Sequence, residues 1–246
     1  MTRTARRSTD KGMGIAPRTS SSRREFDLLA CGIVAGPLFF AISSIAGALR
    51  PGYDPLRHPV SSLEFGPQGW VQAVNFLLTG TLVVFFGWCI RATVRRLGGG
   101  SAVPILLIIV GIGLFGAGMF DPDPLSGYPP GTPPTAPDPS LLRVLHDLFS
   151  TPVFTLLPAA GIVLARRFGR SGQTSRAIYS ALSAAMMVIF FVLASIAFAQ
   201  GTALVPLGGL FQRLTLVTGF GWLALLGWWA IRNQRYRCPT GPALRL

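Results

Sequence analysis

The feature that most constrains this chain is a series of six segments of 18 to 22 residues, each carrying at most one charged side chain. A helix needs about 20 apolar residues, rising 1.5 Å each, to cross the hydrocarbon core of a bilayer. Half of all residues (50%) are hydrophobic, and the mean hydropathy is +0.51. We therefore expect an all-α, polytopic membrane protein, a bundle of six transmembrane helices. The expected spans are 28–49, 71–90, 102–120, 147–165, 178–198 and 214–231.

Basic residues alternate between the connections, and this alternation predicts the orientation of the helices. Of the 22 Lys and Arg, eighteen lie in the two tails and in the second and fourth connections, whereas four lie in the other three connections. Because basic residues are retained on the inner side, we expect both termini to be cytoplasmic and the protein to lie in the cell membrane. The net charge of +13 is then a topology signal and a contact for anionic lipids. Its distribution in short runs argues against a nucleic-acid partner.

Two basic tails are expected outside a membrane domain of residues 28–231. Residues 1–27 lack apolar periodicity, which is typical of a disordered segment, and residues 232–246 form a shorter tail. The motif SRREF near the end of the first tail resembles a twin-arginine export signal. The apolar run behind it is long enough to span and more spans come after it, so we expect it to remain as the first helix.

The connection between the third and fourth spans is rich in proline. Residues 121–139 (DPDPLSGYPPGTPPTAPDP) exclude a regular element and favour an extended, stiff loop. Ser140 is a suitable N-cap for the helical segment after it, in which LLRVLHDLF is expected to form a short interfacial turn before the span at 147–165. Pro152 and Pro158 are expected to bend that span or unwind it locally.

The connection between the first two spans, RPGYDPLRHPVSSLEFGPQGW, concentrates ionisable groups. Its prolines stiffen the backbone, and Ser61 or Ser62 is expected to cap a short helical turn after Val60. Arg57 could pair with Asp54 or with Glu64, and His58 lies between them in sequence. One interpretation is a structural loop held by its own hydrogen bonds, because exposed ion pairs of this kind contribute only about 0–1 kcal/mol.

Three motifs in this region carry a family resemblance. The stretch RPGYDPLRHPVSSLEFGPQGWVQAVNFLLTG, the later GAGMFDPDP and the LHDLFS that opens the fourth span resemble the bacterial membrane family catalogued as domain of unknown function 998. The resemblance covers about residues 28–231, and HPVSSLEFGPQGW is its most specific part. It implies a six-helix integral membrane domain and no established activity.

A functional interpretation places the histidines and several carboxylates in the outward-facing connections. His58, Asp121, Asp123, His146 and Asp147 are all expected at the same ends of the first four spans. Two histidines with carboxylates could hold a divalent metal and activate water, which is the chemistry of a hydrolase acting on lipid headgroups. No HxxxH or HExxH spacing is present, so a metal site would depend on proximity in the fold.

Two further candidate sites involve other side chains. Ser61 or Ser62 could act as a nucleophile with His58 as its base and an Asp beside it, although no GxSxG motif surrounds them. Arg213, with Gln200 and Gln212, could close a binding pocket from the fifth connection, and its guanidinium suits a phosphate or carboxylate.

Three functions therefore remain open from the sequence. The first is a structural or accessory membrane protein with a polar, outward-facing site formed by the connections after the first and third spans. The second is a metal-dependent membrane hydrolase or transferase acting on lipid headgroups. The third is a small-solute transporter, against which stands the absence of charged residues from the middle of every span.

Overall fold

The computed structural model describes residues 20–98, 100–134 and 138–235, and these residues form helices and connecting loops without a β-strand. Apolar sequence explains the helices, because a backbone in hydrocarbon must satisfy its polar groups within the segment. The described elements are α1 Ser20–Ala48, η1 Val60–Glu64, α2 Gly69–Arg96, α3 Ala102–Ala117, α4 Leu141–Arg170, α5 Thr174–Phe198, η2 Val205–Leu207 and α6 Gly208–Arg235.

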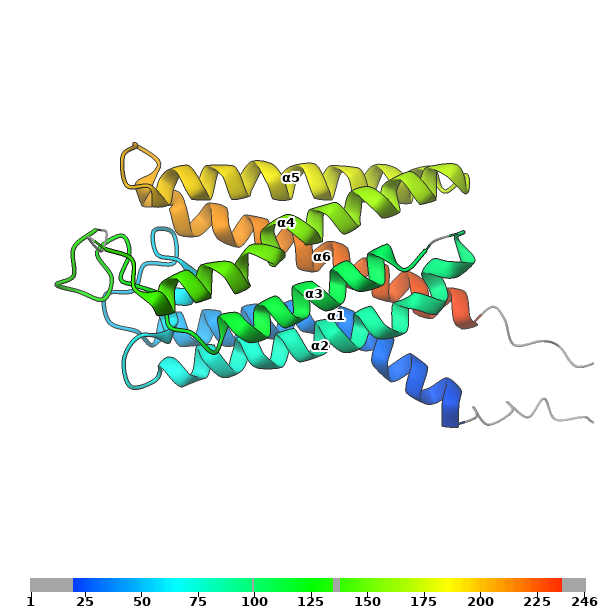
Figure 1. Cartoon of the computed structure of the whole chain (residues 1–246), viewed down its shortest axis with the longest axis horizontal. Helices are drawn as coiled ribbons and strands as arrows, with labels where there is room; N and C mark the ends of the chain where they lie inside the picture. Colours follow the sequence, from blue (N-terminus) through cyan, green and yellow to red (C-terminus); the bar gives the residue numbers. More distant parts are fainter. Residues whose placement is uncertain (1–19, 99, 135–137, 236–246) are drawn as a thin grey trace, which may run out of the picture.

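The six long helices run antiparallel to their neighbours in sequence and pack side by side (Figure 1). Each helix packs on the next one along the chain, and α1 packs on α6, so the bundle closes on itself. Helix α6 also contacts α2 and α4, which places it toward the centre of the bundle. The prediction of an all-α six-helix bundle is confirmed.

Five helices are long and apolar enough to cross a membrane, and α3 is a shorter apolar helix. The 16 residues of α3 give a length of about 24 Å at 1.5 Å per residue. It ends at Ala117, three residues before the predicted end of that span, where glycines lead into the proline-rich connection. The chain is thus a multi-pass membrane protein in which α3 is the shortest helix of the bundle.

Helix α3 lies unusually close to α2 because two glycines face each other. A Cβ atom added to Gly80 would lie 2.5 Å from the carbonyl oxygen of Gly111, and one added to Gly111 would lie 2.7 Å from the carbonyl oxygen of Gly80. Both distances are far below a van der Waals contact. Only glycine at both positions permits this backbone approach.

Helix α4 differs from the prediction, because the expected interfacial turn and the fourth span are one continuous helix, Leu141–Arg170. Ser140 is its N-cap, as predicted, with Oγ accepting a hydrogen bond from the backbone N–H of Arg143 at 3.1 Å. Pro152 and Pro158 both lie inside the helix without ending it. Each proline removes one backbone N–H, and neighbouring helices tolerate that loss within a span. The polar first turns of α4 are therefore rigidly continuous with its apolar part.

The connections divide between the two ends of the bundle (Figure 1). One end of the bundle, which we call the loop end, is formed by the α1–α2 loop (49–68), the α3–α4 loop (118–140) and the α5–α6 connection (199–207). The opposite end, which we call the basic end, contains the α2–α3 and α4–α5 connections. This grouping is the one that the charge pattern predicted. The tail expected at 1–27 lies outside the described residues up to position 19, and α1 begins within it; positions 236–246 of the other tail also lie outside them.

Candidate functional site

A cavity of about 270 Å³ lies at the loop end, between the first half of α4, the last half of α5 and the start of α6. Residues of η1 and of the α3–α4 loop also line it. Its polar lining includes Ser61, Ser62, Asp123, Arg143, His146, Asp147, Ser150, Thr151, Ser195 and Gln212. Its aromatic lining consists of Phe39, Phe76, Phe154, Phe191 and Phe198. Asp147 and Thr151 are exposed whereas Phe39 and Phe76 are buried, so the cavity has a polar rim and an apolar floor.

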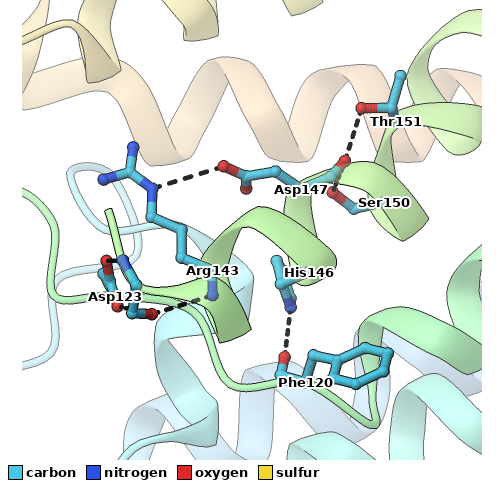
Figure 2. A network of polar contacts seen from close by, with 8 residues as sticks. Phe120, Asp123, Arg143, His146, Asp147, Ser150 and Thr151 are labelled. Carbon is cyan, nitrogen blue, oxygen red and sulfur yellow. Dashed lines mark hydrogen bonds and ion pairs between the residues drawn. The ribbon is translucent and has the colours of Figure 1, made fainter. Parts of the chain in front are cut away.

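Helix α4 supplies half of the polar lining, namely Arg143, His146, Asp147, Ser150 and Thr151, and Figure 2 shows these side chains. Nε of Arg143 lies 3.4 Å from Oδ2 of Asp147 across one helical turn. The side chains are 30% and 61% exposed, so this ion pair contributes only about 0–1 kcal/mol to folding. The Asp147 carbonyl accepts hydrogen bonds from the hydroxyls of Thr151, at 2.6 Å, and Ser150, at 3.3 Å. The pair therefore remains available to a ligand with charges of both signs.

Asp123 anchors the α3–α4 loop to the first turn of α4. Its two carboxylate oxygens accept hydrogen bonds from the Ser140 N–H at 2.8 Å and from the Ser140 hydroxyl at 2.6 Å. The Ser140 hydroxyl in turn caps the helix. Both oxygens of Asp123 are thus engaged in holding the loop at the cavity rim (Figure 2).

His146 is buried and lines the cavity. Its Nδ1 lies 2.8 Å from the carbonyl oxygen of Phe120 (Figure 2). The same atom lies 3.0 Å from the carbonyl oxygen of Ala117. Two acceptors at Nδ1 require a proton on that nitrogen, so Nε2 carries the lone pair when the ring is neutral. Nε2 has no hydrogen-bond partner among the described residues. The ring therefore closes the carbonyl end of α3 and has a second nitrogen that is not engaged by the fold.

Glu64 lies next to His146 rather than next to Arg57. Its side chain is 2% exposed, and Oε2 is 3.7 Å from Nδ1 of His146. Burial raises the pKa of Glu64 to about 9, with a smaller contribution from the negative charge of Asp121. The carboxyl group is therefore protonated at neutral pH. Within the described residues Arg57 forms no ion pair with Asp54 or Glu64, and its buried Nε lacks a partner.

His58 lies outside the cavity, in an aromatic cluster. Its ring centroid is 5.6 Å from that of Tyr53 and 5.0 Å from that of Tyr128, and its Nδ1 accepts a hydrogen bond from the Asp54 N–H at 2.9 Å. Burial lowers the pKa of His58, so the ring is neutral at pH 7. His58 thus packs the α1–α2 loop against the α3–α4 loop, and the structure does not bring it together with His146.

Arg213 and Gln212 fasten the α1–α2 loop to α6. The Arg213 guanidinium donates to the carbonyl oxygen of His58 at 3.1 Å and to the hydroxyl of Tyr53. Gln212 Oε1 accepts a hydrogen bond from the Val60 N–H at 2.8 Å. Of the pocket expected around Arg213, only Gln212 lines the cavity. Arg213 instead holds the loop that forms one wall of it.

The α1–α2 loop differs from expectation in the cap of its helical turn and in the surroundings of Ser61. The short helical turn exists as η1, but its N-cap is Pro59 without a side-chain cap, and Ser61 lies inside the turn. Ser61 lines the cavity, whereas its expected base His58 does not. Asp54 is exposed, and its Oδ1 accepts a hydrogen bond from the Leu56 N–H at 2.9 Å.

The proposed metal ligands do not form a cluster. Among residues 20–98, 100–134 and 138–235, no three His, Cys, Asp or Glu side chains gather into a group that could hold a metal ion. Asp121 is exposed, Asp123 accepts hydrogen bonds from Ser140, and Asp147 forms an ion pair with Arg143. A divalent metal at His58 or His146 thus stays a prediction for analysis in solution.

Sequence reasoning overlooked several cavity residues. Ser150 and Thr151 come four positions after His146 and Asp147 respectively, which is the spacing of one helical face, so continuing α4 through LHDLFST would have found them. Tyr128, which packs on His58 outside the cavity, was also overlooked, because it belongs to a proline-rich loop in which no local pattern indicates that it is buried.

Six antiparallel apolar helices with a polar-rimmed cavity at one end define a multi-pass α-helical membrane protein in contact with membrane lipids. The chain belongs to the family described as Protein of unknown function (DUF998), which it matches over residues 33–229. This range contains every residue that lines the cavity. Comparison with curated proteins and with solved structures gave no match.

Proposed function

We propose that this chain is an accessory protein of the cell membrane that binds the headgroup of a zwitterionic phospholipid in the cavity between α4 and α5. The main support for the proposal is that the cavity lining is polar at the rim and apolar at the floor. The rim includes a partly exposed Arg–Asp pair and the hydroxyls of Ser150 and Thr151, and phenylalanine side chains form the floor. A ligand that matches both must itself be amphiphilic.

The rim fits a headgroup that carries a phosphate and an amine. The planar guanidinium of Arg143 can bind phosphate oxygens in a bidentate manner, and Asp147 offers a carboxylate to an ammonium group. Ser150 and Thr151 add hydroxyls beside them. Because Arg143 and Asp147 are only partly buried, a ligand can separate them at a cost of about 1 kcal/mol or less.

The apolar part of the cavity fits the glycerol and the first methylenes of the acyl chains. Phe154 of α4 and Phe191 of α5 stack with their centroids 4.7 Å apart, and both line the cavity. The volume of about 270 Å³ lies just below the range of about 300 to 1,000 Å³ that is typical of ligand pockets. The headgroup, the glycerol and the first methylenes therefore enter, and the rest of each acyl chain remains in the bilayer.

Thermal unfolding of purified protein in detergent, with and without added phosphatidylethanolamine, tests this proposal. Ala194 lines the cavity on α5 and is 3% exposed, so Ala194→Phe fills it. Ala185→Phe on the exposed face of the same helix is the matched control. A lipid at one hundred times its Kd should stabilise the wild type and the control by about 2.7 kcal/mol and leave Ala194→Phe unchanged. Equal stabilisation of all three proteins would contradict the proposal.

His146 favours a second candidate, a metal-dependent hydrolase or transferase acting on the same headgroup. Its Nδ1 is occupied by backbone carbonyls, and its Nε2 is available to a metal ion or a proton beside the cavity. Metal analysis of the purified protein distinguishes the two candidates. An enzyme of this kind should lose a stoichiometric metal in His146→Ala and retain it in His58→Ala, because His58 lies outside the cavity. No comparable observation favours a transporter.

The same proposal includes the orientation of the bundle, with the basic end and both termini in the cytoplasm. The arginines at the basic end, which lie in the last turns of α2 and α4 and in the first turn of α5, support it through the preference of basic residues for the inner side. A reporter that is active only in the cytoplasm, fused at residue 130, should be inactive, and the same reporter at residue 172 should be active. Activity at residue 130 would reverse the orientation.

A further inference from the structure

A second cavity, of about 420 Å³, lies at the basic end, between the start of α5 and the end of α6. It is separate from the cavity at the loop end and shares no residue with it. The residues that matter for its chemistry are Ser175, Arg176, Tyr179, Trp228, Trp229 and Arg232. We propose that this cavity binds the phosphate of an anionic phospholipid.

Two arginines supply positive charge, and each is held by an indole ring. The guanidinium carbon of Arg232 lies 3.8 Å from the ring centroid of Trp228, and that of Arg176 lies 5.3 Å from the ring centroid of Trp229. Arg176 also donates a hydrogen bond to Oε1 of Gln173. No carboxylate belongs to the described lining, so the two charges are positioned without being neutralised.

A buried donor without an acceptor points to a ligand. Trp229 is 7% exposed, it lines the cavity, and its indole N–H has no hydrogen-bond partner among the described residues. The neighbouring Trp222 shows the ordinary arrangement, with Nε1 donating to the Ser180 hydroxyl at 3.0 Å. An unsatisfied buried N–H is costly, and a phosphate oxygen in the cavity would satisfy that of Trp229.

The start of α5 adds a third source of attraction for an anion. Gln173 is the N-cap of this 25-residue helix and provides no side-chain cap. Ser175 belongs to the first turn of α5 and lines the cavity. The N-terminus of α5, which has no side-chain cap, is therefore next to the cavity. The partial positive charge at a helix N-terminus favours a phosphate there.

The surroundings of the cavity indicate that the phosphate belongs to a lipid. Leu225, in the lining, is 46% exposed, and Ile178 and Leu182 on the adjoining face of α5 are 55% and 61% exposed. These apolar side chains belong to helices that span the membrane, so they face acyl chains. A phosphodiester with attached acyl chains matches both parts of this surface, whereas free phosphate matches only the arginines.

Native mass spectrometry of the full-length protein, titrated with phosphatidylglycerol, tests the site. The variant Arg176→Gln/Arg232→Gln should bind this lipid about ten-fold more weakly than the wild type, since charge-assisted hydrogen bonds are lost. Arg95→Gln/Arg96→Gln removes the same charge from exposed positions at the end of α2 and is the matched control. Its affinity should stay within about two-fold of the wild type.

A third variant and a competition experiment with inorganic phosphate test the site independently of the arginines. Trp229→Phe retains an aromatic ring at that position but removes the indole N–H together with the five-membered ring, so its affinity for phosphatidylglycerol should fall below that of the wild type. Inorganic phosphate at the concentration of the lipid should not displace it. Equal losses in the two double-arginine variants, or displacement by inorganic phosphate, would overturn the proposal. Ala194→Phe, which fills the other cavity, should leave phosphatidylglycerol binding unchanged, so the two proposals fail independently.

Discussion

Oε2 of Glu64 and Nδ1 of His146 lie 3.7 Å apart, with the two side chains 2% and 5% exposed. Glu64 ends η1 in the α1–α2 loop, and His146 belongs to the second turn of α4. Because burial raises the pKa of Glu64 to about 9, the carboxyl group carries a proton at pH 7 and the contact is not an ion pair with a carboxylate. The contact joins the wall of the cavity to the helix that forms its rim.

The raised pKa of Glu64 predicts a loss of stability as the pH rises. The folded protein retains this proton up to about pH 9, whereas the unfolded chain releases it near pH 4.5, so unfolding releases a proton between these values. The stabilisation is complete below pH 4.5 and declines as the pH approaches 9. Thermal unfolding in detergent at pH 5, 7 and 9 should therefore show a falling unfolding temperature for the wild type.

Glu64→Gln removes the titration and nearly preserves the shape of the side chain. Its unfolding temperature should resemble that of the wild type at pH 5 and exceed it at pH 9. Asp138→Asn, which changes an exposed carboxylate of the α3–α4 loop, is the control and should follow the wild-type curve. If Glu64→Gln also follows that curve, the carboxyl group is not protonated in the folded protein at neutral pH.

Gly209 fixes the approach of the α1–α2 loop to α6. An added Cβ would lie 2.5 Å from the carbonyl oxygen of His58 and 2.6 Å from that of Pro55. Gly209→Ala should lower the free energy of unfolding by about 2–3 kcal/mol, because the clash is with backbone atoms. Gly221→Ala on the same helix meets nothing within 4 Å and should stabilise by about 0.5–1 kcal/mol. Two alanine variants of equal stability would show that the loop is not seated on α6.

Arg213 is predicted to be a structural residue rather than a ligand-binding one. It bonds to the carbonyl oxygens of His58 and Gly209 and to the hydroxyl of Tyr53. Arg213→Ala should cost about 2–4 kcal/mol, since several charge-assisted hydrogen bonds are lost and their partly buried acceptors lose this donor. Arg143→Ala, which breaks a half-exposed ion pair, should cost about 1 kcal/mol or less. Denaturant unfolding in mixed micelles measures both, and the reverse order of cost would refute the assignment.

Much of the fold was predictable because the membrane restricts it. Hydrocarbon thickness fixes the length of a span, and charge limits where a span can end, so the six apolar segments were found from composition along the chain. The exception was α4, where the segment LLRVLHDLF, which contains Arg143 and Asp147, was expected to form an interfacial turn before the span at 147–165. These charges lie at the cavity rim at the loop end, where they are partly exposed to solvent, and the helix continues through them.

The site was less predictable because proximity between loops leaves no local pattern. His58 and His146 appeared equivalent in sequence, yet Tyr128, seventy residues beyond His58, packs against His58, and Glu64 lies beside His146. Rings and carboxyl groups so far apart along the chain meet only through the packing of the whole bundle. The residue types of the rim could be predicted, but which of them face the cavity could not.

Photo-cross-linking with a phosphatidylethanolamine that carries a diazirine on its first acyl carbons tests the central claim most directly. Peptide mapping by mass spectrometry then locates the covalent adducts on the purified protein. The cavity proposal predicts that adducts concentrate at residues 150–154 and 191–198 and disappear from both in Ala194→Phe. An even spread over the lipid-facing surface, with residues 182–189 labelled as strongly and no change in the variant, would contradict a headgroup site between α4 and α5.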